Sequence, residues 1–226
     1  RSRRFCGRVS GGCPSLGAKR DYLRMMMLTR RSLIAAAAVL PFARPALAAP
    51  LSLNEISGYL NALKTAKATF TQINADGTIS TGTLYIRRPG RVRFEYDPPE
   101  QSLVMAGGGQ VAIFDSRSNV PPEQYPLSKT PLSIILEQNV NLAQRNMVVG
   151  HGEDGPATVV VAQDPAHPEY GNIALKFTRN PVELRQWIIT DDAGGQTTVV
   201  LNALETGMDL PPSLFSIPIE AEKRGF

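Results

Sequence analysis

Turn signals recur at short, nearly regular intervals along most of the chain, and this spacing constrains the fold more than any other feature. Between the turns, from Ala68 onward, apolar and polar residues alternate with a period of two, which is typical of half-buried strands. Segments with a helical pattern are too few to connect parallel strands. The sequence therefore predicts an antiparallel meander. The clearest turn signals are at residues 76–77, 89–90, 98–99, 107–109, 116–119, 152–156, 164–168, 180–181 and 191–195.

Two segments carry helical patterns. Ser52 with Glu55 three residues later is a capping box, which predicts a helix start. The apolar residues that follow at helical spacing are Ile56, Leu60 and Leu63. A second helix is predicted over residues 131–138, with proline in its first turn. With roughly ten strands, the predicted fold class is mainly β (α+β): a strongly curved antiparallel sheet with its helices on one side.

Residues 1–48 differ sharply in composition from the rest of the chain. They hold ten of the 24 basic residues, one of the 20 acidic residues and both cysteines. The other 178 residues therefore carry 14 basic and 19 acidic groups, a net charge of −5, and no cysteine. That part of the chain excludes disulfides and cysteine-ligated metals, and its length suits one domain with one core.

Residues 25–48 have the three parts of a secretory signal peptide. Arg30 and Arg31 precede a short apolar stretch at 33–40, and Ala46-Leu47-Ala48 forms an A-x-A cleavage site. The stretch is too short to span a membrane, so we expect cleavage after Ala48 and a periplasmic protein. Sec and twin-arginine export stay open. Residues 1–24 are interpreted as a leader upstream of the true start, and 49–226 as a single domain.

Known catalytic and metal-binding patterns are missing from residues 49–226. His151 and His167 both lie in turn sequences without a second ligand at metal-site spacing. The acidic pairs at 153–154 and 191–192 also lie in turns, where such residues favour the local geometry. We expect no enzyme, cofactor or metal, although a hydrolase using these acids stays a minor alternative. The net negative charge argues against a nucleic-acid partner.

Residues 82–99 contain one charge that the strand pattern does not explain. In the second strand of this predicted hairpin, Arg91 and Arg93 lie on the face opposite the apolar residues, so we expect both in solvent. Arg88 instead shares a face with the apolar residues of the first strand. Two interpretations are open: the side chain extends to water at the strand end, or it closes an apolar cavity by donating to carbonyls of a covering helix. The apolar residues of this hairpin are Leu84, Ile86, Val92, Phe94 and Tyr96.

The same residues resemble the LolA family of periplasmic carriers of outer-membrane lipoproteins. The resemblance rests on the runs at 70–72, 82–90 and 94–99, with weaker matches at 103–104, 130–132, 195–197 and 214–215. It implies a half-open β-barrel whose concave face is covered by short helices. It also implies that the cavity between sheet and helices takes up the acyl chains of lipoproteins, which an inner-membrane ABC transporter releases. An outer-membrane acceptor then receives the lipoproteins from the carrier.

The resemblance also implies roles for particular residues. Arg88 corresponds to the lid latch, which hydrogen-bonds to the helical lid in the closed form. The expected wall of the acyl cavity is Leu84, Ile86, Val92, Phe94 and Tyr96, and the expected lid residues are Ile134, Ile135 and Leu136. A monomer is expected. The alternative is a carrier or sensor of the same fold for another lipid or glycolipid.

Overall fold

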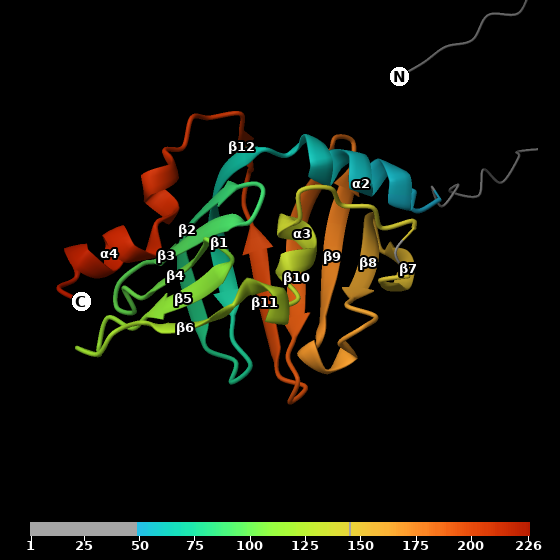
Figure 1. Cartoon of the computed structure of the whole chain (residues 1–226). Helices are drawn as coiled ribbons and strands as arrows, with labels where there is room; N and C mark the ends of the chain where they lie inside the picture. Colours follow the sequence, from blue (N-terminus) through green and yellow to red (C-terminus); the bar gives the residue numbers. More distant parts are fainter. Residues whose placement is uncertain (1–48, 145) are drawn as a thin grey trace, which may run out of the picture. The chain divides into compact units, whose positions relative to one another are not determined.

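The structure, a computed structural model, describes residues 49–144 and 146–226. The leader and signal peptide expected at 1–48 lie outside the described residues. The described chain is dominated by one antiparallel sheet (Figure 1). Its strands are β1 (Thr65–Ile73), β2 (Ile79–Arg87), β3 (Arg91–Tyr96), β4 (Leu103–Gly107), β5 (Gln110–Phe114), β6 (Glu123–Pro126), β7 (Val148–Asp154), β8 (Ala157–Gln163), β9 (Asn172–Arg179), β10 (Val182–Thr190), β11 (Gln196–Leu201) and β12 (Glu205–Thr206).

The strand order confirms the predicted mainly β fold with a curved antiparallel sheet. It runs β6-β5-β4-β3-β2-β1-β11-β10-β9-β8-β7, and β12 pairs with β1. Two meanders, β1 to β6 and β7 to β11, therefore join where β1 pairs with β11, with Phe70 opposite Leu201. The order ends at β6 and β7, so the sheet is open among the described residues. The meanders follow from the short turns between the strands, which allow only neighbouring strands to pair.

Helices lie on both faces of the sheet. They are α2 (Leu53–Ala62), α3 (Ser133–Leu136), α4 (Ile217–Lys223) and the short 3₁₀ turns η1 (Leu127–Lys129), η2 (Pro168–Tyr170) and η3 (Pro212–Phe215). Figure 1 shows α2 along the upper ends of β9 and β8, α3 in front of β10, and α4 beside β3 and β4. The second predicted helix is shorter than expected, because the backbone of Glu137 is extended and ends α3.

Helix α2 begins with the predicted capping box. Ser52 Oγ accepts a hydrogen bond from the backbone N–H of Glu55 at 3.2 Å, and the Glu55 carboxylate accepts one from the backbone N–H of Ser52 at 2.8 Å. Ile56, Leu60 and Leu63 are all buried. The helix thus places one apolar stripe on the sheet, as its sequence pattern predicts.

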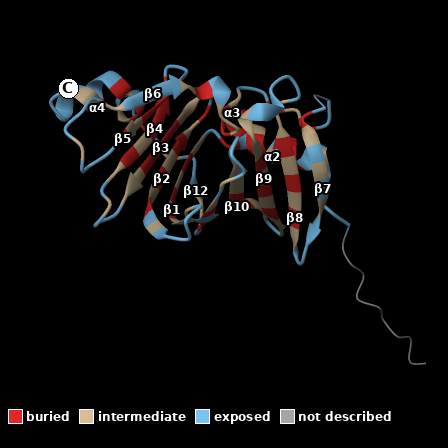
Figure 2. Ribbon diagram, turned by 90° about the horizontal axis from the view of Figure 1, so that it is seen from below, coloured by how far each residue is buried: buried red, intermediate tan, exposed pale blue. Residues whose placement is uncertain are grey.

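The larger core lies between the concave face of the sheet and the two helices α2 and α3. Buried residues alternate along the strands, and Figure 2 shows them as separate bands. A smaller core lies on the opposite face. On β4, Leu103 and Met105 pack with Ile217 of α4, whereas Val104 and Ala106 face the larger core. The expectation that all helices lie on one side is therefore wrong for α4.

Candidate functional site

The apolar residues of the 82–99 hairpin lie on the concave face of the sheet. Leu84 pairs with Phe94, and Ile86 pairs with Val92, across β2 and β3. All four side chains are buried in the larger core, and Tyr96 packs against it half-buried. The alternation predicted from the sequence thus brings the five expected wall residues to one face, since successive side chains of a strand point to opposite sides.

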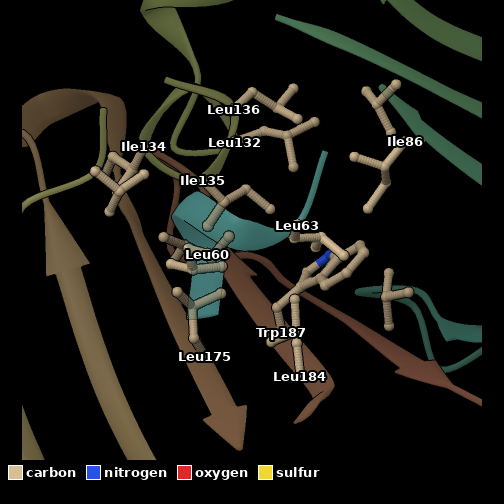
Figure 3. Close-up of a cluster of buried hydrophobic side chains, with 14 of the residues drawn as sticks. Leu60, Leu63, Ile86, Leu132, Ile134, Ile135, Leu136, Leu175, Leu184 and Trp187 are labelled. Carbon is tan, nitrogen blue, oxygen red and sulfur yellow. The ribbon is translucent and has the colours of Figure 1, made fainter. Parts of the chain in front are cut away.

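Helix α3, which we call the lid, packs onto this face. Ile134, Ile135 and Leu136 are between 2% and 5% exposed. Figure 3 shows Leu136 next to Ile86, and Ile135 beside Leu60 of α2. The three expected lid residues therefore cover one end of the apolar face.

Helix α2 and the segment after the lid are held together by side-chain hydrogen bonds to the backbone. The amide of Asn61 donates to the carbonyl of Val140 at 2.8 Å and accepts from its N–H at 2.9 Å. Ser57 Oγ accepts from the N–H of Leu142 at 3.1 Å. Val140 and Leu142, the partners of Asn61 and Ser57, follow α3 in the chain. Helix α2 therefore holds the segment that follows the lid.

Arg88 lies where the lid, α2 and the sheet meet. Its side chain is 7% exposed and does not extend to water. Nη2 donates to the carbonyl of Glu137 at 2.5 Å, directly after the lid, and Nη1 donates to the carbonyl of Leu63 at 3.4 Å, directly after α2. The neighbouring backbone is tied down as well, since Gly90 N–H donates to the carbonyl of Leu136 at 2.9 Å.

The charge of Arg88 is costly in this position. Burial lowers the pKa of its guanidinium, and the Glu137 carboxylate partly offsets that effect. Among the described residues, Arg88 Nε has no hydrogen-bond partner. Arg88 therefore combines two hydrogen bonds to helix-end carbonyls with one buried donor that has no partner among the described residues.

Beyond the lid, the concave face borders a hollow of about 680 Å³. A second hollow of about 530 Å³ shares four of its lining residues, among them Tyr96 and Val104. Of the expected wall residues, Phe94 and Tyr96 line the larger hollow, while Leu84, Ile86 and Val92 lie under the covered end. The apolar face therefore has a filled end beneath the helices and an open end.

Phe94, Tyr96 and Trp187 line the larger hollow, and the buried ring of Phe70 packs against two of them. Phe70 meets Tyr96 edge to face at 5.3 Å between ring centroids and Phe94 at 5.5 Å, and Phe94 meets Trp187 at 6.1 Å. Tyr96 Oη donates to Gln72 Oε1 at 2.8 Å, and burial raises its pKa to about 12. The tyrosine is therefore a neutral hydrogen-bond donor within an apolar surface.

Sequence reasoning did not assign Trp187 and Val199 to the wall, and it did not identify Phe70 as the ring that packs against Phe94 and Tyr96. Alternation along β1 and β11 could have placed Phe70 and Val199 on the concave face. Trp187 was harder to place, because the pairing of β10 with β9 shifts register between Leu184 and Gln186. Such a shift changes which side chains share a face.

The opposite face of β3 is not open to solvent, so the expectation for Arg93 is wrong. Arg93 is 8% exposed, and its side chain contacts Glu95 at 2.6 Å, Glu220 of α4 at 3.1 Å and the carbonyl of Leu214 at 3.1 Å. Helix α4 and η3 cover this face, which strand alternation could not reveal. Arg91 is half-buried.

His151 lies on β7 and not in the turn expected from the sequence, and it contacts a segment 100 residues away, whereas His167 contacts a near neighbour in the sequence. His151 Nε2 lies 2.8 Å from the carbonyl of Leu51, and His167 Nδ1 lies 2.9 Å from Glu169 Oε1. Asp191 and Asp192 lie at the edge of the larger hollow. In the part of the chain that the structure describes, no helix is both long and apolar enough to cross a membrane.

Comparisons with known proteins show which sequences and structures this chain is similar to. The family described as "Outer membrane lipoprotein carrier protein LolA" matches residues 61–218. The outer-membrane lipoprotein carrier protein of Cupriavidus taiwanensis is 26% identical over 216 residues, covering 87% of this chain and 98% of that protein. The protein of the same name from Azotobacter vinelandii is 24% identical, covering 77% and 87%. A crystal structure of a LolA superfamily protein from Nitrosomonas europaea has a TM-score of 0.41 and 8% identity, covering 74% of this chain and 98% of that chain.

Proposed function

This chain belongs to the LolA family, and from that premise we propose that it carries lipoproteins across the periplasm. It binds the acyl chains of lipoproteins released from the inner membrane by an ABC transporter and delivers them to the outer membrane. The observation that carries the proposal is the apolar concave face, filled at one end by the lid and open to a hollow of about 680 Å³ at the other.

The free energy gained by burying the lid side chains is similar in size to the free energy gained by burying one acyl chain. Each CH₂ group removed from water contributes roughly 0.8 kcal/mol, so one chain of about 16 carbons gains on the order of 12 kcal/mol. Burial of the three lid side chains Ile134, Ile135 and Leu136 contributes about 5–9 kcal/mol. Because cargo replaces the lid on the same surface, the free energy of cargo binding is the difference between two large terms. Release of the cargo from the carrier therefore needs no ATP.

Arg88 is proposed as the latch of the closed form. Its bonds to the carbonyls of Leu63 and Glu137 join α2, the lid and the sheet at one point. Cargo that displaces the lid breaks these hydrogen bonds, and their re-formation favours release of the cargo. The proposal also includes export by a signal peptide at 25–48, cleavage after Ala48 and a single carrier domain at 49–226.

Release of lipoproteins from spheroplasts tests the proposed function. Added protein is expected to bring lipoproteins into the supernatant, detected by immunoblotting. Phe94→Leu should reduce this release, because Phe94 lines the hollow. Phe114→Leu is the matched control, since Phe114 is equally buried but belongs to the core under α4. Absence of release by the unmodified protein would refute the proposal, and a co-purified glycolipid identified by mass spectrometry would favour the alternative ligand.

A further inference from the structure

Trp187, the only tryptophan in the sequence, lies on β10, an interior strand of the sheet. It lies on β10 between Val199 of β11 and Leu175 of β9, and its side chain is 1% exposed. The same residue contributes to the lining of the larger hollow. Its position is therefore set by strand pairing on both sides, and a ligand in the hollow meets a fixed indole ring.

The indole nitrogen of Trp187 has no hydrogen-bond partner among the residues that the structure describes. Figure 3 shows this nitrogen on the edge of the ring next to Leu63, and Phe94 packs edge to face on the ring. Buried polar groups in folded proteins are nearly always paired. The other polar aromatic groups of the larger core follow this rule, since Tyr96 donates to Gln72 and Tyr59 Oη accepts from the N–H of Leu184 at 3.1 Å.

We propose that the indole N–H of Trp187 donates a hydrogen bond to the carbonyl oxygen of an acyl chain bound in the hollow. This inference rests on the proposed function and adds a chemical specificity to it. The indole N–H is a donor only, so its partner must bring an acceptor into an apolar site. The carbonyl of an ester- or amide-linked fatty acid is such an acceptor, and it is fixed at the head of the chain.

The bond would make the carrier selective for acyl over alkyl chains. In the closed form Leu63 covers the indole nitrogen, and its carbonyl also accepts from Arg88. Because Leu63 ends α2 and is not part of the lid, the donor becomes accessible only when this end of α2 moves together with the lid. An alkyl ether leaves the N–H unpaired, because it has no carbonyl, whereas an acyl ester pairs it and fixes the depth of the chain.

A matched pair of lipids tests this selectivity. 1-Palmitoylglycerol and 1-O-hexadecylglycerol share chain length and head group but differ in the carbonyl. By isothermal titration calorimetry, the unmodified protein is expected to bind the ester about 5- to 10-fold more tightly, the size of one net hydrogen bond. Trp187→Phe keeps an aromatic ring but removes the N–H, so it should bind the two lipids with equal affinity.

A second measurement avoids the variant altogether. The single tryptophan gives one indole N–H resonance in a ¹⁵N-labelled sample, and this resonance should move downfield with the ester but not with the ether. Equal affinity for the two lipids, or an equal response of the resonance to both, would overturn this inference but leave the proposed function standing. A preference for the ester that persists in Trp187→Phe would overturn it as well. Binding of neither lipid would overturn the proposed function and this inference with it.

Discussion

Arg88 joins the ends of two helices to the sheet through a single side chain. Its guanidinium is buried against two helix-end carbonyls, and burial lowers its pKa. The hydrogen bonds favour the closed form, while desolvation of the charge opposes it. These opposing terms are what the proposed latch role requires, because a latch must hold the closed form and still allow it to open.

Replacement of Arg88 by leucine should separate loading from delivery. Arg88→Leu is expected to accept a lipoprotein but to transfer it poorly, because the carbonyls of Leu63 and Glu137 lose the donor that favours reclosure. Transfer to outer-membrane vesicles measures this effect. Arg87→Leu is the matched control, since Arg87 donates to the carbonyl of Leu210 instead. Normal transfer by Arg88→Leu would show that Arg88 is no latch.

Gly82 has a steric role at the centre of the aromatic floor. A Cβ at this position would meet the carbonyl oxygen of Glu95 and lie 2.8 Å from the ring of Phe70. Gly82→Ala should therefore lower the free energy of unfolding by about 1–3 kcal/mol, measured by urea denaturation. Gly58→Ala in α2 is the control, because a Cβ there meets no atom within 4 Å and alanine stabilises a helix by about 1 kcal/mol. Equal effects of the two variants would contradict this explanation.

At the scale of elements, α4 and the lid differ in how they are attached to the sheet. The lid is a four-residue helix, and its three buried side chains are all apolar. Helix α4 instead carries Glu220, which pairs with Arg93 at 3.1 Å and with Arg224 at 3.0 Å, besides packing Ile217 on β4. The ion pairs fix one orientation of the α4 side chains, whereas the lid has apolar side-chain contacts, and its end is held by hydrogen bonds from Gly90 and Arg88 to its last carbonyls.

Glu220 should make the attachment of α4 depend on pH. Burial raises the pKa of Glu220, but the hydrogen bonds from Arg224 and Arg93 outweigh it and hold the pKa below its usual value. A carboxyl with a lowered pKa in the folded state stabilises above its unfolded pKa, and this stability is lost as the pH falls through the folded value. Glu220→Gln should thus cost about 1–3 kcal/mol at neutral pH, and the difference should shrink toward acid pH.

Thermal unfolding of both proteins between neutral and acid pH measures this dependence. Glu222→Gln is the matched control, because Glu222 lies on the same helix but is exposed. A constant difference between Glu220→Gln and the unmodified protein at all pH values would rule out ionisation of Glu220 as the cause.

At the scale of the whole described molecule, helices cover only part of the apolar face of the open sheet, and the rest borders the larger hollow. A ligand that binds only the folded state raises stability by about 2.7 kcal/mol at 100 times its Kd. For a domain of this size we expect 1-palmitoylglycerol at that concentration to raise the unfolding midpoint by about 5–10 °C. Differential scanning calorimetry measures the shift, and glycerol at the same concentration is the control. An unchanged midpoint would contradict a lipid-binding cavity.

Much of the fold was predictable from local patterns. The capping box of Ser52 and Glu55, the alternation along 82–96 and the turn signals gave α2, the hairpin β2–β3 and the meander order. These features were predictable because they depend on neighbours in the sequence. The lid residues and the wall residues of the hairpin followed from a resemblance, and their roles stay predictions.

The sequence by itself determined which residues share a face, because the strand period of two is a local property of the backbone. Only the tertiary structure decided what covers each face. Arg93 lies on the predicted face but is buried by α4, and Arg88 donates to carbonyls that come 25 residues before it and 49 after it. Trp187 joined the cavity wall through the register shift in β10. Such contacts depend on how distant segments pack, and that packing is fixed by the shape of the whole sheet rather than by any local pattern.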